Sequence, residues 1–296
     1  MMRILITGGS GFLGRQVALL LKDQHQVVGT YREHEVSLDG CLMRRLDVTD
    51  RMGVLSLCRE CRPDAIVHTA VRGDIERCER FPEDAYGVNV QGTVHVAQAA
   101  AEVGARLIYL STDQVYDGAK GHYDESDPPH PLMVYGRTKL AAEQQAAAIC
   151  HETVIVRLAL MYGWGNPSRP TFIDWMLARL RTGQEVPLFV DQYRTPLYVV
   201  QAAEVIKRLL ETPGVGGVFN LGGGERLDRY TFGVKICEVF DLPQRHLKPV
   251  TMATARSTTP RPPDCSLNSA KISTVLGVKL LTADEGLRAL QRQGTR

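Results

Sequence analysis

Two residues in one short stretch have the types and the spacing that proton-transfer chemistry requires. Tyr135 and Lys139 lie four residues apart in Val134–Glu143, so a helix there places both side chains on one face. Hydride transfer to a ketone creates an alkoxide that needs a proton, yet a phenol has a pKa of about 10. A lysine ammonium beside the phenol stabilises the phenolate and lowers that pKa. The pair therefore predicts a site that reduces ketones.

A second tyrosine and lysine at the same spacing, Tyr116 and Lys120, do not predict such a site. Asp117 and Gly118 lie between them and are typical of a turn. The two side chains then need not share a face, and we reject this pair.

A hydroxyl group that polarises the substrate carbonyl is expected near the end of the strand Arg106–Ser111. Ser111 and Thr112 both lie there. A hydrogen bond from either hydroxyl would polarise the carbonyl, and we assign this role to Thr112. The alternative is that both hydroxyls cap the local backbone.

The chain opens with a strand, a glycine-rich turn and a helix. Gly8, Gly11 and Gly14 follow the buried strand Ile4–Thr7 at a spacing of three. The first glycine permits a tight turn, the second lets a pyrophosphate approach, and the third lets the helix pack on the sheet. Backbone amides at the helix N-terminus attract the phosphates. We therefore predict a dinucleotide site, with Phe12 and Leu13 at the first helical positions.

The end of the second strand indicates which nicotinamide cofactor binds. A carboxylate at this position accepts hydrogen bonds from a ribose 2′-hydroxyl, whereas an arginine suits a 2′-phosphate. Thr30 and Tyr31 supply no acid here, and Arg32 follows them. The sequence favours NADPH over NADH, and Glu33 keeps NADH as the alternative.

The third strand is followed by a candidate for adenine binding. Asp47 can accept the adenine amino group, with the Val48 backbone beside it. The alternative role of Asp47 is an N-cap for the next helix, but Thr49 or Asp50 fits the cap better.

Small residues end the fourth strand, and a polar residue follows within an apolar helix. Thr69, Ala70 and Val71 would let the pyrophosphate and ribose lie flat. Asn89, in the helix expected over Glu83–Val103, is predicted to brace the backbone of the active site. The alternative for Asn89 is an exposed helical residue.

Alternating strands and helices must position these residues. Short strands that are apolar on both faces indicate a parallel sheet covered on two sides. We expect strands at Ile4–Thr7, Gln26–Tyr31, Met43–Leu46, Ala65–Thr69, Arg106–Ser111 and Thr153–Leu158, and helices at Phe12–Leu21, Met52–Cys61, Glu83–Val103 and Met133–Cys150. This pattern predicts an α/β fold, a Rossmann-type doubly wound parallel sheet.

The pattern changes after about residue 160. A connection rich in glycine and proline leads to expected helices at Phe172–Arg181, Val199–Glu211 and Tyr230–Phe240, and to short strands around Val190 and at Val218–Leu221. We divide the chain into an NAD(P)-binding Rossmann domain at residues 1–160 and a small C-terminal substrate-binding lobe at residues 161–296. The lobe is expected to be interleaved with the main sheet.

The composition is ordinary for a globular enzyme. The chain has 296 residues, 44% of them hydrophobic and 23% charged, and a net charge of +2. These values give no reason to expect nucleic acid or a membrane as a partner. Seven scattered cysteines suit reduced thiols and a cytoplasmic protein without a signal peptide. Cys58 and Cys61 form a C-x-x-C without a partner pair, so we expect no metal.

These motifs together resemble the extended short-chain dehydrogenase/reductases, and in particular the dTDP-4-dehydrorhamnose reductase-like branch. The stretch Ser111–Gly118 resembles the branch signature S-T-D-Y-V-F-D-G, and Pro131–Glu143 resembles P-L-N-x-Y-G-x-[ST]-K-x-x-x-E. Asp191–Pro196 resembles D-Q-x-G-x-P-T, and Arg261 with Pro262 resembles a late R-P loop.

The resemblance implies an NADPH-dependent reductase of a nucleotide-linked 4-keto-6-deoxy sugar, with homodimerisation possible. It makes Thr112, Tyr135 and Lys139 the catalytic triad, with Tyr135 and Lys139 also touching the cofactor. It assigns the substrate pocket to five further residues, namely Asp113, Gln114, Val115, Arg194 and Arg261. Cationic side chains suit a sugar-nucleotide diphosphate. The alternative for both arginines is a loop ion pair.

Some residues depart from the signatures of the branch, and two other functions remain as alternatives. Gln114 and Tyr116 replace the usual Tyr and Phe, and Tyr193 with Arg194 replaces a residue followed by Gly. One alternative is a nucleotide-sugar epimerase or dehydratase that retains NAD, although Asp113 lacks the adjacent Glu that a dehydratase usually has. The other is a non-catalytic NADP-binding regulatory subunit, because the branch includes the β subunit of methionine adenosyltransferase, which Asp241–Pro249 resembles.

Overall fold

A seven-stranded parallel sheet forms the centre of the molecule. The computed structural model describes residues 1–165, 170–254 and 259–294. The strands run in the order β11-β6-β5-β4-β1-β2-β3, and every neighbouring pair is parallel. Their bounds are β1 Arg3–Thr7, β2 Gln26–Tyr31, β3 Leu42–Arg45, β4 Ala65–His68, β5 Arg106–Thr112, β6 Thr153–Leu158 and β11 Gly217–Leu221. The strand order reverses between β1 and β4, which is where doubly wound folds bind ligands.

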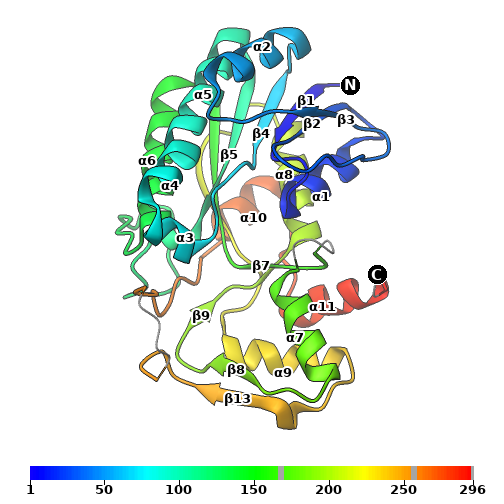
Figure 1. Ribbon diagram of the computed structural model, residues 1–296, viewed down its shortest axis with the longest axis vertical. Helices are drawn as coiled ribbons and strands as arrows, with labels where there is room; N and C mark the ends of the chain where they lie inside the picture. Colours follow the sequence, from blue (N-terminus) through cyan, green and yellow to red (C-terminus); the bar gives the residue numbers. More distant parts are fainter. Residues whose placement is uncertain (166–169, 255–258, 295–296) are drawn as a thin grey trace.

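Helices cover both faces of this sheet (Figure 1). One face carries α1 (Phe12–Leu21), α8 (Val199–Glu211) and α10 (Ala270–Leu276), and the other carries α2 (Arg51–Cys61), α5 (Gly92–Val103) and α6 (Val134–Ile149). Alternate residues of β1 face opposite ways, so Ile4 and Ile6 pack with the first group and Leu5 with the second. Burial on both sides explains why the inner strands are mainly apolar, whereas the edge strand β3 is largely exposed. The predicted fold class is confirmed.

Short helical segments follow β4 and β5 at the edge of the sheet that carries the site. They are α3 (Ile75–Arg80), α4 (Pro82–Tyr86), a π-helical turn at Gly87–Gln91 and a 3₁₀ turn at Asp113–Val115. The helix expected over Glu83–Val103 is uninterrupted in the structure, but it contains this π-helical turn. Thr93 donates a hydrogen bond from its hydroxyl to the Asn89 carbonyl (2.6 Å) within this wide turn, and such turns are frequent at functional sites.

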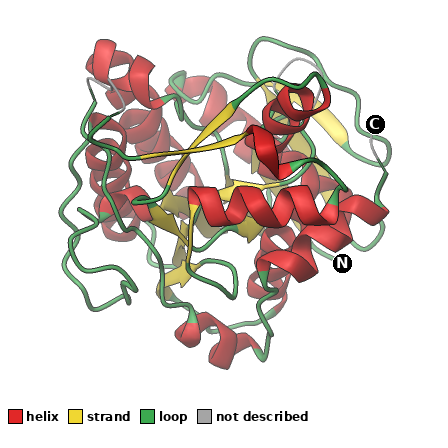
Figure 2. Cartoon of the chain, turned by 90° about the horizontal axis from the view of Figure 1, so that it is seen from below, coloured by secondary structure: helices red, strands yellow, loops and turns green. Residues whose placement is uncertain are grey.

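The lobe lies beyond the carboxyl ends of the strands and has its own apolar core. It contains α7 (Phe172–Arg181), α9 (Arg229–Val239), α11 (Ala283–Arg292) and a 3₁₀ turn at Gln244–His246. Three strand pairs complete it: β7 (Met161–Tyr162) with β10 (Leu197–Tyr198), β8 (Val186–Phe189) with β13 (Leu247–Val250), and β9 (Tyr193–Arg194) with β12 (Leu227–Asp228). Seen from below, strands of the molecule run between groups of helices (Figure 2).

The second half of the chain contributes to both parts of the molecule. After residue 160 it forms the lobe, yet it also returns to the sheet as α8, β11 and α10. Several expected bounds agree with the structure, including those of β2, α1, α7 and α8. The strand expected around Val190 ends one residue earlier, at Phe189. No helix in the described residues is long and apolar enough to cross a membrane.

Candidate functional site

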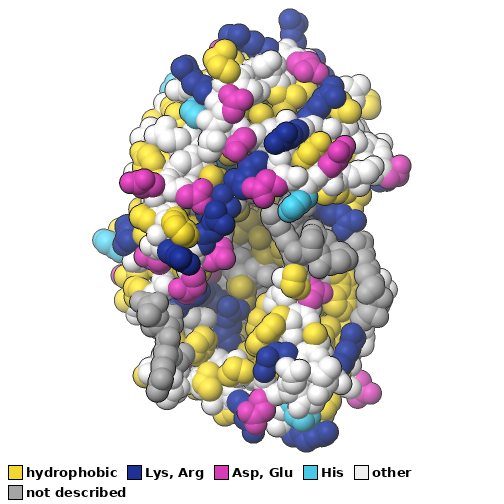
Figure 3. Space-filling model, in the orientation of Figure 1, with side chains coloured by type: hydrophobic (Ala, Val, Ile, Leu, Met, Phe, Trp, Pro, Cys, Tyr) yellow, Lys and Arg dark blue, Asp and Glu magenta, His cyan; other side chains and the backbone are white. Residues whose placement is uncertain are grey.

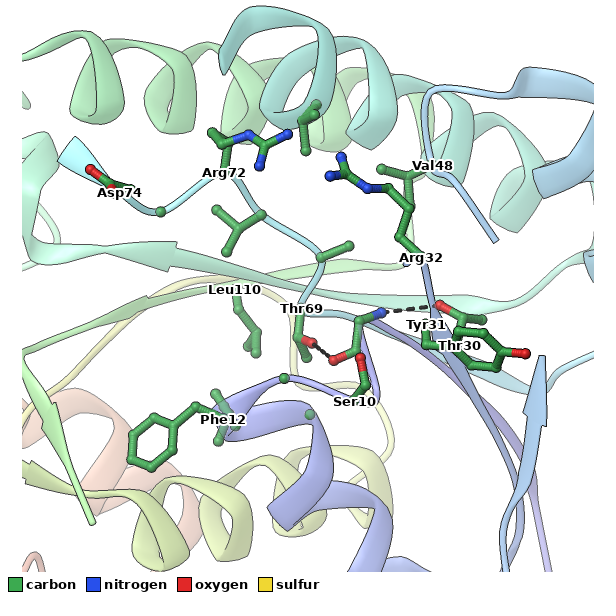
Figure 4. Close-up of a pocket in the computed structure, with 18 of the residues that line it drawn as sticks. Ser10, Phe12, Thr30, Tyr31, Arg32, Val48, Thr69, Arg72, Asp74 and Leu110 are labelled. Atoms are coloured by element: carbon green, nitrogen blue, oxygen red, sulfur yellow. Dashed lines mark hydrogen bonds between the residues drawn. The ribbon is translucent and has the colours of Figure 1, made fainter. Parts of the chain in front are cut away.

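A crevice of about 500 Å³ opens at the carboxyl ends of β1, β2 and β4 (Figure 4). The glycine turn forms its floor. Gly8 has a φ of 69°, which a residue without a Cβ adopts at no steric cost. A Cβ on Gly14 would collide with the Gly8 carbonyl oxygen. Gly11, Phe12 and Leu13 also line the crevice, as predicted for a turn that receives a pyrophosphate.

Two threonines from neighbouring strands hold this turn in place. The Gly8 amide donates to the Thr30 hydroxyl (3.1 Å), and the Thr69 hydroxyl donates to the carbonyls of Thr7 (2.7 Å) and Gly8 (3.1 Å). Ala70 and Val71 line the crevice beside Thr69. These small side chains leave the backbone accessible, so a flat ligand can lie across the turn.

The wall at the end of β2 carries charge of the expected kind. Tyr31, Arg32 and Glu33 line it, and Arg32 pairs with Glu33. Arg72, on the loop after β4, reaches toward the same part of the pocket (Figure 4). The Nε of Arg72 lies 2.9 Å from Asp84 Oδ2, which orients the guanidinium. Sequence reasoning missed Arg72, because no motif marks it.

Asp47 and Val48 line the crevice as predicted. Asp47 Oδ1 accepts hydrogen bonds from the Thr49 amide (2.9 Å) and hydroxyl (2.8 Å). Burial opposes ionisation of Asp47, but the bonds from Thr49 prevail and lower its pKa. Asp50 caps α2 by accepting from the Gly53 amide (3.0 Å), so Asp47 is not the cap.

Asn89 lies behind the crevice wall rather than on it. Its side chain is 1% exposed, and it accepts from the Arg72 amide (2.8 Å) and donates to the Arg72 carbonyl (3.2 Å). It also donates to the Thr138 hydroxyl (3.0 Å). These bonds fix the loop that carries Arg72, which is the bracing role expected of Asn89 from the sequence.

Tyr135 and Lys139 share one face of α6, and both line the crevice. Lys139 Nζ donates to the Leu110 carbonyl (2.6 Å) and lies 4.1 Å from the centre of the Tyr109 ring. Burial lowers the pKa of Lys139 to about 7, against the attraction of Glu143. Burial also raises the pKa of Tyr135, and a hydrogen bond with the Thr112 hydroxyl opposes that rise. The phenol therefore holds its proton at neutral pH.

The two candidate hydroxyls at the end of β5 have different surroundings. Ser111 donates to the buried Glu143, which forms an ion pair with Arg157 at 2.7 Å. Thr112 lies beside a second cavity and accepts from the Gln114 amide (3.2 Å). Thr112 thus caps the local backbone, as the alternative predicts, and its role toward a substrate carbonyl stays a prediction.

The rejected tyrosine–lysine pair is indeed apart. Tyr116 is buried and stacks on Tyr123, whereas Lys120 is half exposed and pairs with Asp127. Tyr116 and Lys120 thus lie in different surroundings.

Cys58 and Cys61 lie on α2, and no cluster of His, Cys, Asp and Glu in the described residues could hold a metal ion.

A second cavity of about 220 Å³ adjoins the crevice, and Tyr135 and Ser111 line both. The face in Figure 3 is hollowed between the sheet and the lobe, with Lys and Arg side chains at its border. Of the five residues expected to bind the substrate, four line this cavity and one does not. Asp113, Gln114, Arg194 and Arg261 line the cavity, whereas Val115 is wholly buried in the core with Tyr116 and Cys265. The assignment of Val115 to the pocket is corrected.

Arg229 and Gln192 also line this cavity, and sequence reasoning missed both. Arg229 is the first residue of α9, and Gln192 lies in the loop before β9. A lone arginine at a helix start carries no sequence signal of its own. The lobe brings the two together, because Arg229 Nε donates to Gln192 Oε1 (3.1 Å).

Comparison with known proteins gives matches along the whole chain. The family described as the RmlD substrate binding domain matches residues 2–295. A probable low-salt glycan biosynthesis reductase, Agl14 of Haloferax volcanii, is 32% identical over 294 residues, covering 98% of this chain and 97% of its own. The β subunit of methionine adenosyltransferase 2 from Xenopus laevis is 30% identical over 282 residues, covering 91% and 81%.

A solved structure gives the same picture. The dTDP-4-dehydrorhamnose reductase of Bacillus anthracis, determined in complex with NADP, superposes with a TM-score of 0.85 at 26% identity. The match covers 99% of each chain. The crevice and the cavity beside Tyr135 therefore belong to a fold that is shared along its whole length.

Proposed function

The chain belongs to the RmlD substrate binding domain family, and from this premise we propose that it is an NADPH-dependent reductase of a nucleotide-linked 4-keto-6-deoxy sugar. The observation that carries the proposal is the position of Tyr135. Its side chain lines both the dinucleotide crevice and the second cavity, with Lys139 behind it and Thr112 beside it. A proton donor at that junction serves a ketone that meets the cofactor there.

Each residue at the junction of the crevice and the second cavity has its own role in the proposed reduction. The cofactor supplies a hydride to the carbonyl carbon when it is bound. Tyr135 gives its phenolic proton to the carbonyl oxygen, so the ketone becomes a secondary alcohol. Thr112 donates a hydrogen bond to the same oxygen and stabilises the developing negative charge. Lys139 in its charged form favours the tyrosinate left behind.

The crevice suits a dinucleotide, because the glycine turn and the small residues Thr69 and Ala70 line it without bulky side chains. We assign the site to Gly8, Gly11, Gly14 and the wall from Tyr31 to Asp47, and we favour the phosphorylated cofactor. Arg32 and Arg72 provide two guanidinium groups at one end of the crevice, and guanidinium binds phosphate oxygens in pairs. The relative from Bacillus anthracis is described with NADP.

A regulatory role is the second candidate, because methionine adenosyltransferase subunits are among the relatives. In that case the chain would bind NADP and a partner enzyme without reducing a ketone. The proton donor, its lysine and the hydroxyl residue are all present in this chain. Their joint placement where the crevice and the second cavity meet supports catalysis.

Reduction of a sugar ketone can be tested directly. Purified protein is mixed with NADPH and a panel of nucleotide-linked 4-keto-6-deoxy sugars, and the loss of NADPH absorbance is followed. We expect turnover with at least one substrate and its loss in Tyr135→Phe, with Tyr116→Phe as the matched control outside the crevice. Absence of turnover with every substrate, together with stable capture of a partner enzyme, would favour the regulatory role.

A further inference from the structure

The second cavity carries more positive than negative charge. Of the residues that the structure describes, three arginines line it, namely Arg194, Arg229 and Arg261, and one carboxylate, Asp113. Taking charges out of water is costly unless they are paired, so the partners of each guanidinium decide which one is available to a ligand.

Two of the three guanidinium groups already have partners. Arg194 donates to the Tyr193 carbonyl (2.5 Å) and the Pro262 carbonyl (3.1 Å), and its Nε lies 3.5 Å from Asp113 Oδ2. Arg261 forms an ion pair with Glu76 of α3 at 2.6 Å. Both arginines therefore connect neighbouring loops, as the alternative of a loop ion pair predicts.

Arg229 differs from both. Within the part of the chain that the structure describes, its guanidinium makes one hydrogen bond, to Gln192, and no ion pair. Its Nη1 is buried without a hydrogen-bond partner. Phe172 lies under the group, 5.5 Å from ring centre to Cζ, and holds it in place. The guanidinium thus has a fixed position, and its Nη1 has no hydrogen-bond partner among the described residues, although Asp113 of the same cavity attracts its charge.

The charge on Arg229 persists at neutral pH. Burial and the charges of Arg194 and Arg261 lower its pKa to about 9, against the attraction of Asp113. A cation in such a place is stabilised when a ligand brings an anionic oxygen, because charge-assisted hydrogen bonds to guanidinium are strong and directional.

The size of the cavity limits where that oxygen can be. At about 220 Å³ it is smaller than the ~300–1,000 Å³ of sites that take a drug-sized ligand. It has room for a sugar ring beside Tyr135 but not for a whole nucleotide. An anion that meets Arg229 is therefore attached directly to the ring.

We propose that Arg229 is a specificity-determining residue that binds an anionic oxygen carried by the substrate on its sugar ring. This inference rests on the proposed function and adds the residue that selects the charge. Two sources share this chemistry: the phosphate ester on the anomeric carbon, and a carboxylate on the ring itself.

Binding measurements separate the two sources. Protein saturated with NADP⁺ is titrated calorimetrically with dTDP and thymidine, with UDP and uridine, and with UDP-glucuronate and UDP-glucose. The variant is Arg229→Gln. The matched control is Arg245→Gln, which removes one positive charge from an exposed turn of the same lobe. Thermal melting shows whether each variant is folded.

We expect Arg229→Gln to weaken binding of the ligands that carry the anion it binds by about 30-fold. Binding of thymidine and uridine, and all binding by the control variant, is expected to stay unchanged. A loss on the diphosphates identifies the phosphate ester as the anion. A loss confined to the preference for glucuronate over glucose identifies a ring carboxylate. Equal affinities of Arg229→Gln and wild type for all six ligands would overturn the inference.

Two further results keep the proposal testable. If Arg229→Gln does not fold, Arg229→Lys keeps the charge but loses the forked geometry, and we expect a loss of at least threefold on the same ligands. No change in that variant would also overturn the inference. If wild-type protein binds no nucleotide and reduces no sugar ketone, the proposed function fails, whereas unchanged variants of an active reductase refute Arg229 alone.

Discussion

Lys139 shows at the scale of one residue how burial adjusts a titratable group. Its ammonium donates to the Leu110 carbonyl and lies over the Tyr109 ring, away from bulk water. Burial lowers its pKa to about 7. The lysine therefore changes charge close to neutral pH, whereas the pKa of Tyr135 is raised and the phenol keeps its proton.

The pH dependence of reduction follows from this charge. Below about pH 7 Lys139 is protonated and favours the tyrosinate, and above it the charge is lost. We expect kcat with saturating NADPH to fall as the pH rises through about 7. In Lys139→Met, kcat is expected to be lower by about 100-fold and to lose this falling limb. Measurement of kcat between pH 5.5 and 9 tests the expectation, with the Kd for NADPH as the control. The same falling limb in the variant would assign the titration to another group.

Arg32 and Arg72 follow different strands, and both line the crevice in which we expect the cofactor. We expect Arg32→Gln and Arg72→Gln each to raise the Kd for NADPH by about tenfold and to leave that for NADH nearly unchanged, because only NADPH carries a 2′-phosphate. Fluorescence titration of both cofactors measures this. Arg44→Gln is the control, since Arg44 pairs with Glu60 at 3.2 Å and does not line the crevice. An equal change for both cofactors would remove the arginines from 2′-phosphate recognition.

At the scale of elements, α6 connects the catalytic face to a buried ion pair. Tyr135, Lys139 and Glu143 repeat at a spacing of four on this helix. Glu143 meets Arg157 of β6 at 2.7 Å, with side chains 4% and 6% exposed. Arg157 also donates to the Tyr116 hydroxyl (2.8 Å). The helix is thus anchored to the sheet one turn beyond its lysine.

Removal of one partner is expected to cost more than removal of both. Arg157→Met leaves Glu143 buried without its counter-ion and is expected to lower the free energy of unfolding by about 3–5 kcal/mol. The double variant Glu143→Leu with Arg157→Met removes both charges and is expected to be more stable than the single one. Urea unfolding of the three proteins measures this. A double variant as unstable as the single variant would show that packing, rather than charge, sets the cost.

The wide turn inside the expected helix Glu83–Val103 has a local cause as well. Between α4 and α5 the π-helical turn Gly87–Gln91 carries Asn89 inward. There the side chain bonds the backbone of Arg72 and the Thr138 hydroxyl. Apolar periodicity alone predicts one continuous helix, because a single wide turn alters that pattern very little.

At the scale of the whole molecule, the two halves of the chain complete one another. The face of the sheet under α1 is covered by α8 and extended by β11, and both come from the second half. The lobe in turn supplies Arg229, while the first half supplies Thr112 and Tyr135. We therefore treat residues 1–160 and 161–296 as functional regions of one folding unit.

A fragment of residues 1–160 tests this interpretation. Without α8 the fragment would expose the apolar face that includes Val17, Val154 and Val156. Contact of this face with water costs a free energy of roughly 25 cal/mol for each Å². We expect no cooperative thermal transition in the fragment, measured by near-ultraviolet circular dichroism beside the full chain. A sharp transition would instead show that the Rossmann region folds alone.

Local rules allowed the sequence by itself to determine most of the frame. The glycine turn, the bounds of α1 and β2, and the shared face of Tyr135 and Lys139 depend on short-range spacing, and these expectations agree with the structure. The family likeness also rests on such stretches.

Only the tertiary structure decided which charges are paired. Arg194 and Arg261 looked available in the sequence but bind neighbouring loops and Glu76, whereas Arg229 and Arg72 carried no signal yet reach the two cavities. Val115 was expected to line the pocket, but its side chain packs in the core. The physical reason is that a side chain's partners lie far away in the chain, and packing alone brings them within reach.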